Sequence, residues 1–290
     1  MTDPAKSQED LKEDIERLFE EGPSANRERA RAVFGRLREE LSVGRVRSAE
    51  PDPSTPAGWR VNTWVKKGIL VGFRCGELMD VSPEGRGARF FFGDKDTLPL
   101  KKMDATMGVR VVPGGSSIRD GAYVGRGVIC VPPMYINIGA YVGESSLIDS
   151  HALVGSCAQV GRRVHISAGA QIGGVIEPVG AIPVIIEDDV LVGGNTGIYE
   201  GAVIKTRAVI GAGTILTGST PIYDLVNERI IKPEGDEPLV VPEGAVVVPG
   251  SRAVTQGMGP KWGLSLYTPV IVKYRDEKTD ARTSLEQWVR

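Results

Sequence analysis

The chain has 290 residues, which is enough for one large domain or two modest ones with their own cores. Its 35 basic and 37 acidic side chains leave a net charge of −2, which argues against a surface dedicated to nucleic acid or to an anionic membrane. There are 37 glycines and 19 prolines, yet 41% of the residues are hydrophobic. A disordered glycine-rich tract would be more polar, so these glycines are expected in ordered turns.

The three cysteines, Cys75, Cys130 and Cys157, are far apart and form no Cys-x-x-Cys pair. This spacing supports neither a disulfide framework nor a zinc ribbon, and it favours a reducing compartment. Residues 1–22 are acidic, unlike a secretory signal, and no apolar stretch approaches the ~20 residues of a membrane span. We therefore expect a soluble cytoplasmic protein without a nucleic-acid or membrane partner.

Helical patterns dominate residues 1–105, which we assign to an N-terminal helical domain. Apolar residues recur at helical spacing within residues 8–21, 26–41 and 64–73. Gly44 follows the second pattern as a helix stop, and PDPSTPAG at 51–58 predicts a linker or turn before the third. We expect this domain to cap an open end of the structure that follows.

A six-residue repeat organises residues 106–255. Steps of six from Ile118 give sixteen positions, interrupted once, and fifteen of them are Ile, Val or Leu. These positions are Ile118, Val124, Cys130, Ile136, Val142, Ile148, Val154, Val160, Ile166, Ile172, Ile186, Val192, Ile198, Ile204, Ile210 and Leu216. A period of six fits a short strand and a corner with one inward aliphatic side chain, so three hexads make one triangular coil of a parallel β-helix.

The residues beside this row are small. Glycine follows the aliphatic position in seven hexads, at Gly125, Gly143, Gly155, Gly161, Gly173, Gly193 and Gly211. We attribute these glycines to a tight corner that requires a positive φ. The fifth position of a hexad is often alanine, as in Ala122 and Ala140, which suits a cramped interior.

The repeat is interrupted once, between Ile172 and Ile186, by two hexads plus two residues. The sequence therefore predicts a loop near 175–183, whose apolar residues suit a lid over a ligand. The six-step rhythm returns at Val241 and Val247, and residues 265–274 predict a closing strand. That strand belongs to a C-terminal strand and helix extension, residues 256–290.

Few side chains outside the repeat suggest chemistry. His151 and His165 are the only histidines, too few for a three-histidine zinc site, so no metal site is expected. Either could act as a general base, although a hydrogen-bonding role is the commoner fate of a lone imidazole. The triplet 187–189, Glu-Asp-Asp, predicts a solvated corner. Asp149 occupies the slot where glycine is commonest, which aspartate tolerates, and its carboxylate should project outward toward a ligand or a neighbouring subunit.

Several segments resemble one enzyme family, the tetrahydrodipicolinate N-succinyltransferases of lysine and diaminopimelate synthesis. They are RVVP (110–113), YINIGAYV (135–142), LIDS (147–150), VGSCAQVG (154–161), VHISAGAQIGGVIEP (164–178) and PVIIEDD (183–189). WVKKGILVGFR (64–74) and SLYTPVIVK (265–273) are similar to the family's flanking domains. The resemblance covers most of the chain from about residue 60.

This resemblance implies a mainly β protein: a homotrimer of left-handed β-helices with a helical N-terminal domain and a small C-terminal β extension. It implies active sites in the clefts between subunits, where succinyl-CoA, a co-substrate rather than a tightly bound cofactor, donates its acyl group to ring-opened tetrahydrodipicolinate. The family's substrate-binding arginine and aspartate fall on Arg110 and Asp149. We expect Ser167, Gly174 and Lys205 to contact coenzyme A.

The chain departs from the family pattern at one position. A glutamate implicated in catalysis falls on Gly197 here, and Glu200 matches a different glutamate. The catalytic residues are therefore expected to be Asp149, alone or assisted by Glu200 or another carboxylate. An acetyl-CoA donor, a nucleotide-sugar acceptor and a non-catalytic solenoid remain alternatives.

Overall fold

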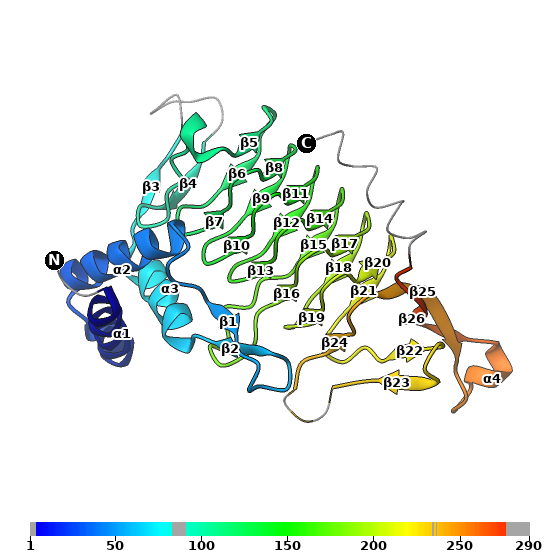
Figure 1. Ribbon diagram of the computed structural model, residues 1–290. Coiled ribbons are helices and arrows are strands. Elements are labelled where there is room, and N and C mark those ends of the chain that lie inside the picture. Colours follow the sequence, from blue (N-terminus) through cyan, green and yellow to red (C-terminus); the bar gives the residue numbers. More distant parts are fainter. Residues whose placement is uncertain (1–3, 83–90, 234, 236, 277–290) are drawn as a thin grey trace.

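Three flat parallel walls enclose the core, as the period of six predicts (Figure 1). The computed structural model describes residues 4–82, 91–233, 235 and 237–276. Each coil adds one two-residue strand to each wall, and strands paired across an uninterrupted coil lie eighteen residues apart, as in the register Val142↔Val160. The predicted left-handed parallel β-helix is confirmed.

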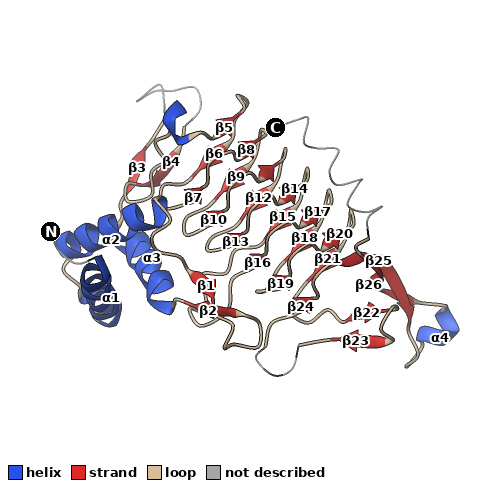
Figure 2. Ribbon diagram, viewed as in Figure 1, coloured by secondary structure: helices blue, strands red, loops and turns tan. Residues whose placement is uncertain are grey.

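The walls are numbered in the order in which one full coil visits them. The first wall contains β6 (Ser117–Ile118), β9 (Tyr135–Ile136), β12 (Leu153–Val154), β15 (Gln171–Ile172), β18 (Gly197–Ile198) and β21 (Ile215–Leu216). The second wall contains β7 (Tyr123–Val124), β10 (Tyr141–Val142), β13 (Gln159–Val160), β16 (Ile185–Ile186), β19 (Val203–Ile204) and β24 (Val240–Val241). The third wall contains β5 (Arg110–Val111), β8 (Ile129–Cys130), β11 (Leu147–Ile148), β14 (His165–Ile166), β17 (Leu191–Val192) and β20 (Val209–Ile210). Figure 2 shows how short these strands are compared with the turns between them.

Stacked aliphatic side chains fill the interior of the coils. All sixteen positions of the six-residue row are buried, with an exposed fraction of at most 8%, at Val124. The alanines at the fifth positions are buried beside them, for example Ala122 and Ala158 at 0%. Because each buried aliphatic side chain stabilises the fold by ~1.5–3 kcal/mol, this row holds successive coils in register.

The seven corner glycines do not have the positive φ that the sequence analysis predicted for them. The left-handed backbone falls two residues later, for example at His151, Cys157 and Gly169. The seven glycines instead lie where neighbouring coils come close: a Cβ on Gly155 would be 2.2 Å from the nitrogen of Gly174. Asp149 occupies this same slot without a positive φ, so tolerance of a left-handed backbone does not explain it.

The N-terminal region contains α1 (Pro4–Glu20), α2 (Arg27–Ser42) and α3 (Thr63–Cys75), with short 3-10 turns at Gly22–Ser24 and Ala105–Met107. Two hairpins complete it, β1 (Ala49–Pro51) with β2 (Trp59–Val61) and β3 (Leu78–Asp80) with β4 (Gly93–Lys95). The predicted turn at 51–58 joins β1 to β2, closed by the Asp52 N–H donating to Gly58 O at 2.8 Å. Within the described ranges, no helix has the length and apolar character needed to span a membrane.

The helices lie beside the coils rather than over their open end (Figure 1). Their core includes Ile138 and Cys157, which project from the corner between the first and second walls. The expected cap is therefore wrong for the helices. Met103 and Val109, just before the first coil, pack on the end of the β-helix core instead.

The C-terminal end contains a second insertion that the sequence did not reveal. After Leu216 the chain leaves the coils and forms the hairpin of β22 (Ile222–Asp224) and β23 (Arg229–Ile231), and β24 then rejoins the second wall. β25 (Ala245–Ala253) then pairs with β26 (Ser265–Tyr274), which is the predicted closing strand, and α4 (Gly259–Trp262) connects them. Residues 277–290 of the predicted extension lie outside the described residues.

Candidate active site

The residues predicted to bind or react lie at three places on the β-helix. Arg110, Asp149 and Ser167 lie on the third wall or at its trailing corner, Gly174 and Glu200 lie at the corner after the first wall, and Lys205 lies at the corner after the second wall. A single chain therefore separates Asp149 from Glu200 by the width of the first wall.

Arg110 and Asp149 share the third wall. Arg110 pairs with Ile129, and Ile129 pairs with Leu147, two residues before Asp149. Because neighbouring strands are ~4.8 Å apart, Arg110 and the strand leading to Asp149 are roughly 10 Å apart along the coil axis. Arg110 is exposed and Asp149 is half-buried, so both can meet a solute on this wall.

Asp149 has a carboxylate with spare acceptor capacity. Its Oδ1 accepts the N–H of Ser150 at 2.7 Å, and no other described donor reaches the carboxylate. Ser167 follows β14 at the equivalent point of the next coil, since Ile148 pairs with Ile166. The wall therefore presents a carboxylate and a hydroxyl at successive coils.

Gly174 and Glu200 meet in one pocket of about 520 Å³ beneath the inserted loop. Its lining is Leu153, Gly173, Gly174, Val175, Glu177, Pro178, Ala181, Tyr199 and Glu200. The Oε2 atom of Glu200 accepts the N–H of Gly218 at 2.8 Å, which fixes one end of the carboxylate. Two exposed carboxylates, Glu177 and Glu200, and no cationic side chain among the lining residues make this pocket suited to an amine.

Glu177 and Tyr199 were missed by the sequence interpretation. Glu177 lies on the inserted loop, which the sequence analysis described only as an apolar lid. The ring of Tyr199 lies over two glycines: a Cβ would be 2.5 Å from the ring at Gly197 and 2.9 Å from it at Gly173. A ring therefore occupies the space where a side chain at position 197 would begin.

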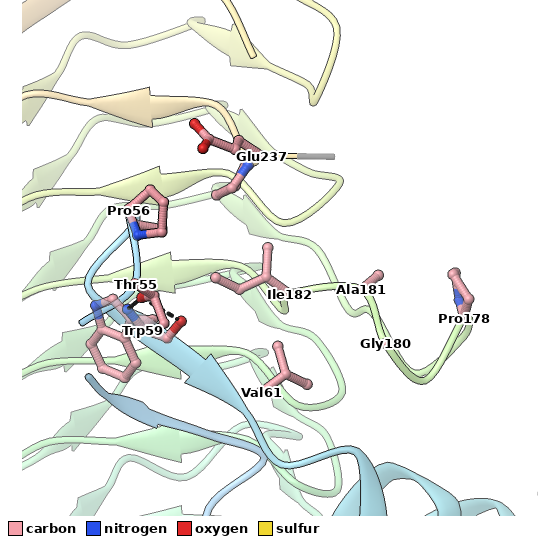
Figure 3. A pocket seen from close by; sticks show the side chains of 11 residues that line it. Thr55, Pro56, Trp59, Val61, Pro178, Gly180, Ala181, Ile182 and Glu237 are labelled. Atoms are coloured by element: carbon pink, nitrogen blue, oxygen red, sulfur yellow. Dashed lines mark hydrogen bonds between the residues drawn. The ribbon is translucent and has the colours of Figure 1, made fainter. Parts of the chain in front are cut away.

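A second pocket, of about 580 Å³, lies on the other side of the inserted loop (Figure 3). The turn of the β1–β2 hairpin, the loop and residues 237–238 line it. Pro178 and Ala181 border both pockets, so the tip of the loop separates them.

Lys205 is already engaged within the chain. Its ammonium donates to Glu187 Oε1 at 2.8 Å and to the carbonyl of Ala57 at 2.7 Å, and Trp59 Nε1 donates to the same carboxylate at 2.9 Å. Burial alone would raise the pKa of Glu187, but the hydrogen bonds from Lys205 and Trp59 outweigh it and keep that pKa below its usual value. Contact with coenzyme A would use the third donor of the Lys205 ammonium.

The acidic triplet 187–189 lies at the corner after the second wall, and two of its carboxylates bind groups of that corner, in line with the corner that the sequence predicts. The Oδ1 atom of Asp188 accepts the N–H of Arg162 at 2.8 Å, and Asp189 pairs with Arg163 at 2.7 Å. Glu187 differs from the expected solvated corner, because its side chain is only 18% exposed.

The two histidines lie close to Asp149, one at the same corner and one on the neighbouring strand. His165 faces outward from β14 and is half-buried, and His151 is exposed at the left-handed corner two residues after Asp149. The N–H of His151 donates to Pro133 O at 2.6 Å, which fixes this corner.

Comparisons with known proteins agree with this arrangement. Residues 10–75 match a family model described as tetrahydrodipicolinate N-succinyltransferase N-terminal, and residues 183–218 match one described as hexapeptide repeat of succinyl-transferase. The chain is 39% identical to a 2,3,4,5-tetrahydropyridine-2,6-dicarboxylate N-succinyltransferase of Idiomarina loihiensis, over 97% of this chain and 98% of that relative. The chain belongs to this N-succinyltransferase family.

Other members support the assignment. The protein of the same name from Polynucleobacter asymbioticus is 40% identical over 90% of both chains, and that of Xylella fastidiosa strain Temecula1 is 40% identical over 90% of this chain and 88% of its own. The family likeness begins by residue 10, earlier than the resemblance near residue 60 suggested. The N-terminal helices therefore belong to the family's architecture.

Proposed function

We propose that this chain transfers the succinyl group of succinyl-CoA to the amino group of ring-opened tetrahydrodipicolinate. The observation that carries the proposal is its 39% identity to a named N-succinyltransferase across nearly the whole length of both chains. The same alignment favours the succinyl donor over an acetyl donor. The three cysteines are free and buried, which supports a reducing, cytoplasmic setting.

The reaction is a simple acyl transfer. The amine nitrogen attacks the thioester carbonyl, the new C–N bond forms, the C–S bond breaks and the coenzyme A thiolate leaves with the proton lost by the nitrogen. A carboxylate can take that proton and orient the amine, which suits Asp149 or Glu200. Gly174 is exposed in the pocket lining and has no side chain, so an acyl chain can approach its backbone closely.

Arg110 suits the acceptor because the acceptor is a dicarboxylate. A guanidinium binds a carboxylate through two parallel hydrogen bonds, which fixes orientation as well as charge. In this proposal Arg110 binds one carboxylate of the acceptor, and Asp149 faces the amine of the acceptor. Ser167, one coil beyond Asp149, and Lys205 remain the proposed contacts to coenzyme A.

A homotrimer is part of the proposal. Asp149 precedes the first wall and Glu200 follows it, so one chain keeps the two carboxylates apart, whereas a neighbouring chain can bring one toward the other. The N-terminal region covers part of the second wall, where the guanidinium of Arg47 lies 3.8 Å above the ring of Tyr141. The third wall keeps an outer row with Leu147, Leu191 and Val209, which supports contact with another copy.

The test is a thiol-release assay with succinyl-CoA or acetyl-CoA, each with and without tetrahydrodipicolinate. We expect release that requires the acceptor and is at least tenfold faster with succinyl-CoA. Faster release with acetyl-CoA would reassign the donor, and no acceptor-dependent release would refute the proposal. Light scattering of the purified chain should give a mass close to three chains of 31.1 kDa.

A further inference from the structure

The inserted loop accepts one hydrogen bond from α3 and packs on two hydrophobic clusters that the N-terminal region shares with the coils. Ile176 packs on the core of the helices, and Ile182 packs on a small cluster with Ala49 and Ala57. Between them the carbonyl of Ala181 accepts the ammonium of Lys66 at 2.5 Å. This last contact is the polar one, and it lies next to the loop tip that separates the two pockets.

Lys66 is an unusual residue to bury. It lies in the first turn of α3, its exposed fraction is 0%, and no carboxylate of the described residues pairs with it. Burial lowers the pKa of Lys66, and burial also raises the pKa of the nearby Cys157 thiol to about 12, so Cys157 provides no counter-charge. A buried amine without an ion pair is destabilising unless its donors are used, and the described partner is the loop carbonyl.

The position of that carbonyl matters to both pockets. Ala181 lines the pocket of Gly174 and Glu200 and also the pocket shown in Figure 3. The N–H of Ala181 donates to Pro178 O at 3.0 Å, so the tip of the loop is a closed turn. A contact that fixes Ala181 therefore fixes the width of the pocket that contains Glu177 and Glu200.

We propose that Lys66 is a positioning residue that holds the inserted loop over the Gly174–Glu200 pocket. This inference rests on the proposed function, since that pocket is taken to receive part of the substrates. Lys66 does not touch them. It acts through the Ala181 carbonyl, and the apolar contacts of Ile176 and Ile182 allow the loop to remain attached, but less tightly, when the ammonium is removed.

The chain offers a matched control in Lys101. Its ammonium donates to the carbonyl of Ser42 at 2.9 Å, and burial lowers its pKa as it does for Lys66. The backbone N–H of Lys101 donates to Ile118 O in the first coil, three coils before the inserted loop. Lys101→Met therefore removes the same kind of bond without touching the loop.

The experiment compares the full-length wild type with Lys66→Met and Lys101→Met by hydrogen–deuterium exchange and by steady-state kinetics. In Lys66→Met we expect the amides of residues 175–183 to exchange about tenfold faster, and KM for at least one substrate to rise about tenfold with kcat within threefold of the wild type. Lys101→Met should leave both quantities within twofold. Lys66→Gln, whose shorter side chain cannot span the same distance, is the second variant if Lys66→Met fails to fold, and its changes should have the same direction.

The two measurements separate the possible failures. Unchanged exchange of the loop in Lys66→Met would overturn the anchoring, and faster exchange with unchanged KM would overturn the positioning role. Equal effects of Lys66→Met and Lys101→Met would make Lys66 a general stability residue. A wild type without succinyl transfer would refute the proposed function, while the exchange result would still decide whether Lys66 anchors the loop.

Discussion

The ring of Tyr199 lies directly over the backbone of Gly197, so that a Cβ on Gly197 would be 2.5 Å from Cε2 of Tyr199. The resemblance to the family implies a glutamate where this chain has Gly197. A side chain at that position and the present placement of the ring exclude each other. Gly197 is therefore paired with a tyrosine that lines the pocket of Gly174 and Glu200.

We expect Gly197→Ala to lower the free energy of unfolding by roughly 1–3 kcal/mol, because the methyl group forces the ring of Tyr199 away from its place. In a chain that already carries Tyr199→Ala, the same change should have less than half of that effect. Urea unfolding of the four variants measures both values. An equal loss in the two backgrounds would contradict the pairing of Gly197 with Tyr199.

Asp149→Ala should reduce acceptor-dependent thiol release by at least a hundredfold, because the carboxylate proposed to orient the amine is removed. The corner itself should survive, since its backbone is not left-handed and the N–H of residue 149 still bonds to Ile166 O. Light scattering checks that the oligomer is intact. Near-normal turnover would assign the aspartate to structure alone.

Arg110→Lys should raise KM for the dicarboxylate about tenfold or more, because a single point charge replaces a two-pronged donor. Arg110 is exposed, so the fold should not change. Initial rates at varied concentrations of each substrate provide the measurement. If KM for succinyl-CoA rose instead, Arg110 would lie at the donor site and the proposed placement of the acceptor would be wrong.

Asp224 should make stability depend on pH in strongly acidic solution. Burial alone would raise the pKa of this carboxyl, but hydrogen bonds from Asn227, Tyr274 and Arg229 outweigh it and lower the pKa from 3.8 to about 2. As the pH falls, Asp224 is protonated in the unfolded chain before it is protonated in the folded one. The Asp224 carboxylate therefore adds about 2 kcal/mol to the free energy of unfolding above pH 3.8, and this contribution is lost as the pH falls through about 2. In Asp224→Asn, the difference between the melting temperatures at pH 4 and pH 2.5 should shrink.

The control for this pH dependence is Asp10→Asn, which changes an exposed carboxylate on α1. Its melting temperatures should follow those of the wild type at both pH values. If Asp224→Asn and the wild type lost the same stability between pH 4 and pH 2.5, the hydrogen bonds around Asp224 would not favour its charged form.

The sequence predicted the coils well because their cause is local and repeated. One inward aliphatic side chain every six residues requires the same short strand and corner each time, so the row from Ile118 to Leu216 was readable without any knowledge of distant contacts. The sequence was misleading where one residue type can satisfy two different structural requirements. Gly155 fits a positive φ or a close approach of backbones, and only the position of Gly174 in the next coil decides between them.

The candidate site was predictable only in part. Sequence motifs singled out Arg110, Asp149, Gly174 and Glu200, and spacing alone located the inserted loop. Spacing could not reveal Tyr199, Glu177 or Lys66, because each acquires its place from segments distant in the chain. The bond from Lys66 to Ala181 joins residues 115 positions apart.

What the sequence by itself determined is the repeating architecture, since a period of six encodes the shape of a coil through short-range sterics and burial. What only the tertiary structure decided is how the non-repeating segments lie on that rod: the helices beside the coils, the second insertion at 217–239, and the loop fixed by a buried ammonium. These arrangements depend on surfaces that meet across the fold, and no local pattern in the chain specifies them.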